Sequence, residues 1–276
     1  MILLMALTFP IEGEYGLRPA IQLAGQGIRV QFMTDDMAAK CELLERMVAE
    51  FEARIKPLPT FSYEAPEEAL NLMKLASRHV TGVVALARAG FHLLSPAEVA
   101  ARAAFEASVR AAWMLSPDDV FAQEARWATH LLGEITYLDK EIEEGTKVMG
   151  IDMTLTVKRR DGLADFCDSV SKLITERGHR PRRGLPPIPE MLKEIGERKT
   201  YAIYSLLCQT AHGSHYSTWI FRGNGVGIDK TRGDYVTEEK WNVPLSIARF
   251  VFTGPAMIAF NRFGLDTSGL NKLIGP

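Results

Sequence analysis

The pattern that most constrains this chain is a row of apolar residues at alternating spacings of four and three. Its members are Met37, Cys41, Leu44, Val48, Phe51 and Ile55. Such spacing places all of them along one side of an α-helix, which is typical of the seam in a helical bundle. Thr34 is a good N-cap for this helix, and Pro57 and Pro59 end it. The sequence therefore predicts a bundle helix over residues 34–55.

The helical period returns in several later segments. We expect helices over residues 66–91, 95–115, 119–144, 163–177, 190–195, 201–216 and 243–263, the last one broken near Gly254. The quartet Ser95-Pro96-Ala97-Glu98 has the form of a capping box, with proline at the first helical position. Residues 145–160 contain MTLTV and are predicted to form a loop or a short strand.

Two segments lack helical composition. Residues 1–33 hold several prolines and glycines and are predicted to form an N-terminal non-helical arm. Glycines alternate with aromatic and β-branched residues near residues 219–237, which indicates a short β-hairpin. The predicted fold is thus all-α: an irregular helical bundle over residues 34–276, treated as a single domain after the arm.

Composition excludes several classes of protein. The 276 residues are 47% apolar and 24% charged, which is ordinary for a soluble globular chain. The formal net charge of −2 provides no overall attraction to nucleic acid or to an anionic membrane. Three scattered cysteines argue against a disulfide framework and favour a reducing, cytoplasmic setting. We expect no signal peptide, no membrane span and no cofactor, and the sequence leaves a homo-oligomer open.

The segment 201–216 is the densest cluster of chemically capable side chains. On a helix, one stripe would consist of Tyr201, Tyr204, Cys208, Ala211, His212 and His215, with Ser205 almost above His212. The rest of the circumference is largely apolar or small, so the helix should be buried. Buried hydroxyl and imidazole groups need hydrogen-bond partners, and the stripe must therefore face something polar.

A charged triplet on the predicted third helix is the natural partner. Arg102, Glu106 and Arg110 are four residues apart and share one helix face, among small and apolar neighbours. One interpretation is a solvated ion pair on the surface. The other is a partly buried Arg–Glu pair that meets the Tyr/Ser/His stripe. The second interpretation predicts that Arg102 and Glu106 lie within contact range of His212.

Two segments of the chain resemble a known protein family. They are VALARAGFHLLSPAEVAARAAFEASVRAAWML and, about ninety residues later, YAIYSLLCQTAHGS. The family that they resemble is DUF5677, whose members are bacterial, mostly helical proteins of unknown function. The resemblance covers roughly residues 65–217. It maps an Arg-x-x-x-Glu helix and a later Ser and His onto Arg102, Glu106, Ser205 and His212, with Tyr204 beside them. It implies no activity, and a binding or interaction module built round a buried seam is our first hypothesis.

The second hypothesis is an enzyme, an RNA-directed hydrolase in stress or phage defence, distantly similar to HEPN-type nucleases. Those use Arg-x(4–6)-His near a helix end, and that motif is absent here. A composite catalytic site of Arg102, Glu106 and His212 could still perform acid–base chemistry. Tyr204, Ser205 and His215 are then candidate binding residues.

Metal binding is the third hypothesis. Cys208, His212 and His215 have the spacing of three ligands on one helix face. However, a single helix rarely provides all three ligands without a fourth group opposite, so our prediction for a metal is none.

Overall fold

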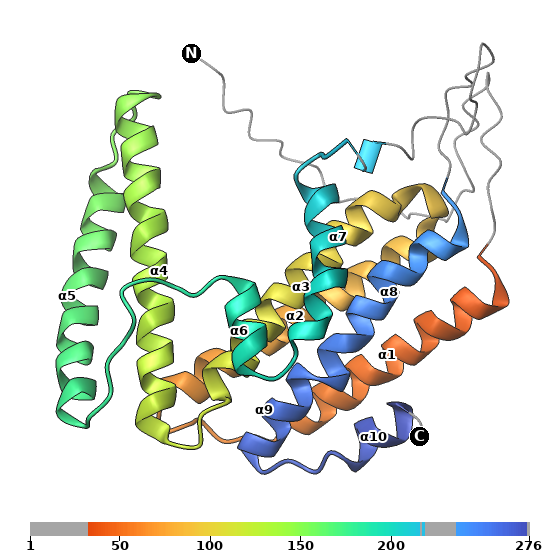
Figure 1. Ribbon diagram of the computed structural model, residues 1–276, viewed down its shortest axis with the longest axis horizontal. Helices are drawn as coiled ribbons and strands as arrows, with labels where there is room; N and C mark the ends of the chain where they lie inside the picture. Colours follow the sequence, from red (N-terminus) through yellow and green to blue (C-terminus); the bar gives the residue numbers. More distant parts are fainter. Residues whose placement is uncertain (1–32, 216, 219–235, 275–276) are drawn as a thin grey trace, which may run out of the picture.

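Long α-helices carry most of the described chain (Figure 1). The computed structural model describes residues 33–215, 217–218 and 236–274, and no strand is found among them. The predicted all-α class is therefore confirmed for these residues. The helices are α1 (Asp35–Ile55), α2 (Glu64–Ala89), α3 (Leu94–Leu115), α4 (Val120–Lys147), α5 (Thr154–Glu176), α6 (Ile188–Glu194), α7 (Tyr201–Ala211), α8 (Glu238–Thr253), α9 (Pro255–Phe263) and α10 (Ser268–Ile274), with short 3-10 turns η1 (Phe91–Leu93) and η2 (Arg198–Thr200).

Helix α3 lies at the centre of the bundle. It contacts α2, α4, α6, α7, α8 and α9, and most of its side chains are buried. Its sequence is rich in alanine, so many of its side chains are small. Because interaxial distances depend on the side chains at the contact, this allows several helices to approach α3 closely.

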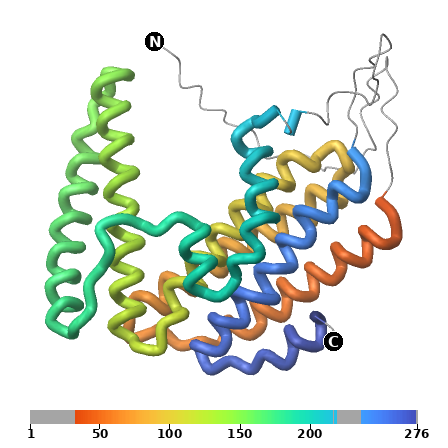
Figure 2. Tube along the Cα trace, viewed as in Figure 1, coloured from red at the N-terminus to blue at the C-terminus, as the bar shows by residue number. Residues whose placement is uncertain are grey.

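The two ends of the described chain meet in one hydrophobic core. Helix α8 runs beside α1 and α3, and α10 lies against α1 (Figure 2). Phe51 of α1 stands between Phe252 and Phe260, with ring centroids 5.8 Å from each. The predicted break near Gly254 is confirmed, since α8 ends at Thr253 and α9 begins at Pro255. Residues 238–263 are the one described stretch long and apolar enough to cross a membrane, but much of it is buried inside the protein.

Helices α4 and α5 form a hairpin that projects from the body of the bundle (Figure 1). The loop or strand predicted for residues 145–160 is wrong, because α5 already begins at Thr154. The Asp152 carboxylate accepts hydrogen bonds from the backbone and the hydroxyl of Thr154, which starts the helix there. The helix predicted to end at residue 144 also continues through Gly145 to Lys147. Gly145 is buried inside the helix, where a Cβ would meet the Met153 sulfur at 2.5 Å.

Other predicted boundaries are also corrected. The Ser95–Glu98 capping box does not form, because α3 continues directly from η1 and starts at Leu94. Helix α7 ends at Ala211 and not at 216. By contrast, Thr34 is the N-cap of α1 as predicted, and its hydroxyl accepts from the backbone N–H of Met37.

Two predictions concern residues outside the described ranges. The N-terminal arm occupies residues 1–33, of which only Met33 is described. Most of the β-hairpin predicted near residues 219–237 lies outside as well. Its last two residues, Val236 and Thr237, are described and lead into α8 without forming a strand.

Candidate functional site

Two aromatic rings fix α7 against α3. Tyr204 of α7 stacks on Phe105 of α3, with ring centroids 5.1 Å apart and planes 18° from parallel. The Tyr204 hydroxyl then donates a hydrogen bond of 2.9 Å to Oε1 of Glu106, one residue further along α3. The stack places the ring, and the hydrogen bond sets its orientation, so α7 meets the charged triplet of α3 as the sequence predicts.

Glu106 is the shared acceptor of this cluster. Its Oε1 also accepts from Nε of Arg102 at 2.8 Å, and its Oε2 lies 3.7 Å from Nη2 of Arg110. The side chains of Arg102 and Glu106 are 22% and 23% exposed, so the pair is partly buried and is neither sealed nor free on the surface. The predicted partly buried Arg–Glu pair is therefore confirmed, and the edge of the cluster reaches solvent.

His212 lies at that open edge. It is the C-cap of α7, and its backbone N–H donates to the carbonyl of Cys208 at 3.1 Å. Its Nε2 lies 3.4 Å from Nη1 of Arg102, which is hydrogen-bond distance. A neutral imidazole with its proton on Nδ1 would accept from this guanidinium. The prediction that Arg102 and Glu106 both lie within contact range of His212 is confirmed for Arg102 only. Among the described contacts, no hydrogen bond or ion pair joins Glu106 to His212, and Glu106 reaches it only through Arg102.

The environment fixes the charges of two members of the cluster. Burial raises the pKa of Tyr204 far above its usual range, and hydrogen bonds with Cys208 and Glu106 raise it further. Tyr204 therefore stays protonated and donates permanently to Glu106. Burial lowers the pKa of Arg102, but the hydrogen bond to Glu106 and the charge of Glu106 raise it by more. The pKa of Arg102 is therefore raised overall.

A second polar link joins the same two helices. Thr210 of α7 donates a hydrogen bond of 2.6 Å to Oε2 of Glu98 on α3. Burial raises the pKa of Glu98, while the hydrogen bond from Thr210 opposes that shift. The sequence assigned Glu98 to a local capping box, and so this contact was missed. Glu98 lies four residues before Arg102 and so continues the spacing of Arg102, Glu106 and Arg110. That spacing on a largely buried helix could have indicated that Glu98 has a partner on another helix.

The remaining predicted residues do not all join the cluster. The hydroxyl of Ser205 donates to the carbonyl of Ala202 within α7 and makes no described contact with Arg102 or Glu106. His215 is exposed and lies beyond the end of α7, so it does not continue the helical stripe with Cys208 and His212. Among the described residues, no group of three His, Cys, Asp or Glu side chains is placed to hold a metal ion.

Replacing Tyr204 by phenylalanine removes only the hydroxyl and keeps the stack on Phe105. We expect the free energy of unfolding to fall by about 1.5–2 kcal/mol, because one hydrogen bond to a charged, partly buried carboxylate is lost. Chemical denaturation measures this change. The matched control is Tyr201→Phe on the same helix, whose ring is exposed. A loss as large in the control would contradict the assignment.

A further ionic cluster, which the sequence did not predict, ties α3, α4 and α6 together. Glu194 accepts hydrogen bonds from Nε1 of Trp113 and Nη2 of Arg126, both at 2.8 Å, and from Arg182 at 2.6 Å. The Arg126 guanidinium also lies 5.0 Å from the centre of the Trp113 ring. Because each basic group already has Glu194 as counter-charge, we assign this cluster to holding the three helices together and not to binding a ligand.

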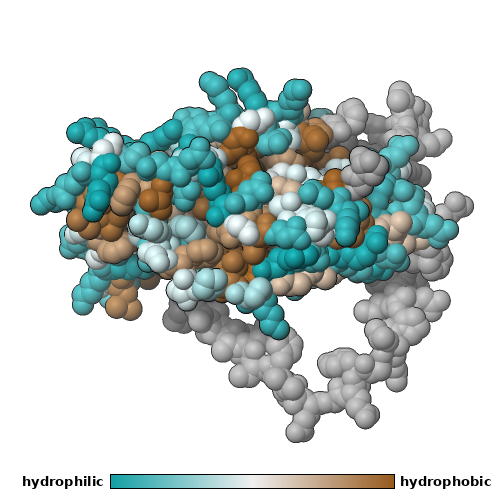
Figure 3. All heavy atoms as spheres, turned by 90° about the horizontal axis from the view of Figure 1, so that it is seen from below, coloured by the Kyte–Doolittle hydropathy of each residue, from teal (hydrophilic) through white to brown (hydrophobic). Residues whose placement is uncertain are grey.

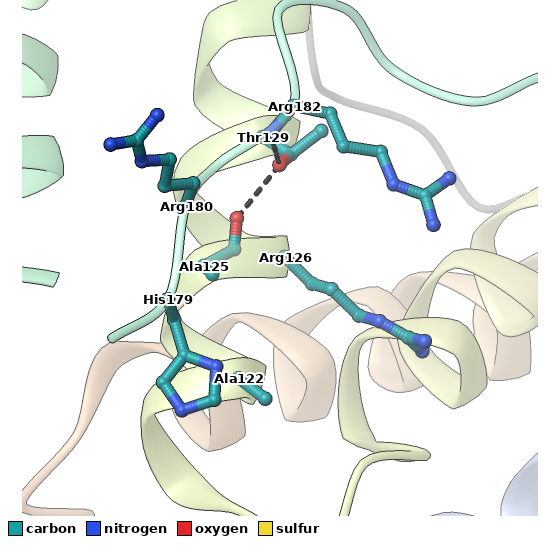
Figure 4. A pocket seen from close by; sticks show the side chains of 7 residues that line it. All are labelled: Ala122, Ala125, Arg126, Thr129, His179, Arg180 and Arg182. Atoms are coloured by element: carbon teal, nitrogen blue, oxygen red, sulfur yellow. Dashed lines mark hydrogen bonds between the residues drawn. The ribbon is translucent and has the colours of Figure 1, made fainter. Parts of the chain in front are cut away.

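A small cavity of about 160 Å³ lies beside this cluster, between α4 and residues 179–182. Figure 4 shows that Arg126 and Arg182 extend to one side of it while His179 and Arg180 point to the other. A second cavity, of about 410 Å³, lies between the end of α1 and α2, where Ile55 and Leu70 meet Lys56 and Lys74. The residues that line these two cavities do not include Arg102, Glu106 or His212.

No family model, no curated protein and no solved structure matches this chain. The similarity to DUF5677 therefore stays a prediction.

Proposed function

We propose that the protein is a binding module whose contact point is the Arg102–His212 edge of the cluster, and that it holds a negatively charged group there. The observation that carries the proposal is the 3.4 Å approach of Nη1 of Arg102 to Nε2 of His212 at an exposed position. These nitrogens come from two helices that Phe105, Glu106 and Tyr204 hold together. The edge is therefore preorganised, which lowers the cost of ordering it on binding.

The charges of the cluster favour an anion. Glu106 is the one carboxylate paired with the two guanidinium groups of Arg102 and Arg110, so the three side chains sum to one positive charge. The oxygen Oε1 of Glu106 is already used twice, by Arg102 and Tyr204, and is not available to a ligand. Guanidinium N–H groups are strong donors to phosphate and carboxylate oxygens. In the tautomer that accepts from Arg102, the His212 ring can add its Nδ1–H as a further donor. Phosphate is the simplest probe of such a site.

The test is a titration with inorganic phosphate, followed by the NMR signals of the six histidine rings. One ring signal, assigned by its absence from the spectrum of His212→Ala, should move with added phosphate. Arg102→Met should weaken this response at least tenfold, because a charge-assisted hydrogen bond contributes about 1.5–3 kcal/mol.

The matched control is His92→Ala, which removes an exposed histidine from η1. Its phosphate response should equal that of the wild type. A wild-type His212 signal that stays fixed while phosphate moves other histidines would refute the binding site. Thermal unfolding of each variant checks that the fold is retained.

The second candidate function is the RNA-directed hydrolase. The observation in its favour is again His212, since an exposed imidazole beside a guanidinium is the pair that handles the 2′-hydroxyl and the phosphate in HEPN-type nucleases. Wild type and His212→Ala, matched in thermal stability, are each incubated with total cellular RNA. Cleavage by the wild type alone would establish the enzyme, and cleavage by neither, with phosphate binding intact, would leave the binding module.

A further inference from the structure

The hairpin of α4 and α5 carries an unusual amount of exposed apolar surface. The large apolar side chains exposed on it are Tyr137, Val148, Met149, Ile151, Leu155, Phe166 and Leu173. They are seven of the thirteen such side chains in the described residues, so this surface is concentrated on the projecting hairpin. Figure 3 shows apolar side chains that reach the surface at this end of the molecule.

Three of these side chains form one stripe along α5. Leu155, Phe166 and Leu173 are 82%, 48% and 63% exposed. Phe166 lies eleven residues after Leu155, and Leu173 lies eighteen after it, which correspond to about three and five turns of helix. All three therefore point the same way. The buried face of α5, at Cys167 and Ile174, is directed elsewhere. Phe166 packs edge-to-face on Trp127 of α4, with ring centroids 6.0 Å apart, and about half of its side chain remains exposed.

A glycine completes the stripe. Gly162 lies seven residues after Leu155 and four before Phe166, in the middle of α5. A Cβ at this position would meet nothing within 4 Å, so the fold of one chain does not require glycine there. An exposed glycine inside a helix is unfavourable relative to alanine. Its place in an apolar stripe indicates a notch that another helix can approach.

The stripe is complementary to itself. If a second α5 lies antiparallel across a two-fold axis level with Ala164, Leu155 faces Leu173 of the second copy. In the same register, Gly162 faces Phe166 of the second copy, so that a large ring enters a notch. We propose that this face of α5 is the interface of an antiparallel homodimer, with a second copy of this chain as the occupant.

The area of this surface limits how strongly two copies can associate. Helix α5 has 23 residues and is about 34 Å long, and a contact strip about 10 Å wide covers roughly 350 Å² of each copy. A standard stable interface buries about 800 Å² per partner. The dimer is therefore expected to be weak and to dissociate on dilution.

The first experiment is sedimentation of the full chain over a concentration series. Wild type should change from monomer to dimer, and Leu173→Ser should weaken this association at least tenfold. The matched control is Leu75→Ser, which removes a leucine that is 45% exposed on α2. Its association should equal that of the wild type. A wild type that stays monomeric throughout, or that forms larger species, overturns the proposal.

The register has its own test. Equal amounts of Leu155→Cys protein and of Leu173→Cys protein with a mass tag are mixed and gently oxidised, with wild type as the control for Cys208. The antiparallel register predicts covalent dimers of unlike chains. If each variant cross-links mainly to itself, the arrangement is parallel and the proposed interface is wrong.

Gly162→Leu should stabilise the monomer and weaken the dimer. It should raise the melting temperature of the dilute monomer, because leucine is a better helix former and its Cβ has open space. It should weaken dimerisation at least tenfold, because the notch for Phe166 is filled. Stronger dimerisation by this variant would overturn the register.

Discussion

Replacing Glu194 by glutamine should lower the free energy of unfolding by about 3 kcal/mol. Burial already lowers the pKa of Arg126, although the charge of Glu194 supports its protonated form. The variant leaves this partly buried guanidinium without its counter-charge, while its Nη1 stays fixed to Ser116. Removing one member of a buried ion pair costs about 3–5 kcal/mol, and the pair's remaining exposure places the expected loss at the lower end. Urea unfolding measures it.

The control for this variant is Glu190→Gln. Glu190 binds only Arg182 among the described contacts, at 2.7 Å, and its side chain is half exposed. Its loss should change the stability by less than about 0.5 kcal/mol. Equal losses in the two variants would show that Glu194 has no special place in the fold.

Glu194 also determines how the stability of the protein depends on pH. Burial raises the pKa of Glu194, but the hydrogen bonds from Arg182 and Trp113 and the charge of Arg126 outweigh it, and the net pKa lies below its ordinary value of 4.5. The unfolded chain therefore binds the proton first as the pH falls. The contribution of Glu194 is complete above pH 4.5 and is lost progressively below it. The difference between wild type and Glu194→Gln should shrink over that acidic range.

Replacing Phe105 by alanine should cost about 4 kcal/mol, since truncating a buried phenylalanine typically costs 3–5 kcal/mol. Phe105 is fully buried, stacks on Tyr204 and lies 5.3 Å from the ring of Phe250 on α8. The variant removes the common support of α7 and α8. Calorimetry and urea unfolding should both record the loss.

Phe105→Leu is the graded comparison, because it keeps most of the volume. We expect a loss below about 2 kcal/mol. The phosphate response of His212 should weaken in the alanine variant and persist in the leucine variant, because α7 is held by what remains of the packing. A response that survives in Phe105→Ala would mean that the ring does not position the site.

The sequence was sufficient for much of this fold because periodicity and capping are local properties. Thr34 begins α1 as its hydroxyl dictates, and the apolar row that follows is buried as expected except for Val48, which is half-buried while its neighbour Met47 is buried. The pairing of Arg102 with Glu106 and the approach of His212 could also be predicted. The pairing follows from two residues that share one face of α3, which is largely buried. The expectation that the helix over 201–216 is buried was wrong, because only Tyr204 and Leu207 of α7 are buried and its opposite face is exposed.

Glutamates used across the fold could not be predicted in this way. Glu98 binds Thr210, Glu124 accepts from the backbone N–H of Ala65 at the start of α2, and Glu194 joins three basic or aromatic partners. Each partner lies far away in the sequence, so no local pattern marks the contact. The end of α7 was also missed. Gly213 has a φ of +60° and turns the chain into the left-handed region one residue after His212.

The position of α3 bears on how the chain is made. Its cover includes α8 and α9, which begin more than a hundred residues after α3 ends. At about 5–20 residues per second, a ribosome completes that intervening stretch only after several seconds. Throughout this interval the central helix has been synthesised without its final cover. The core around α3 can therefore close only after α8 and α9 have been synthesised, late in translation.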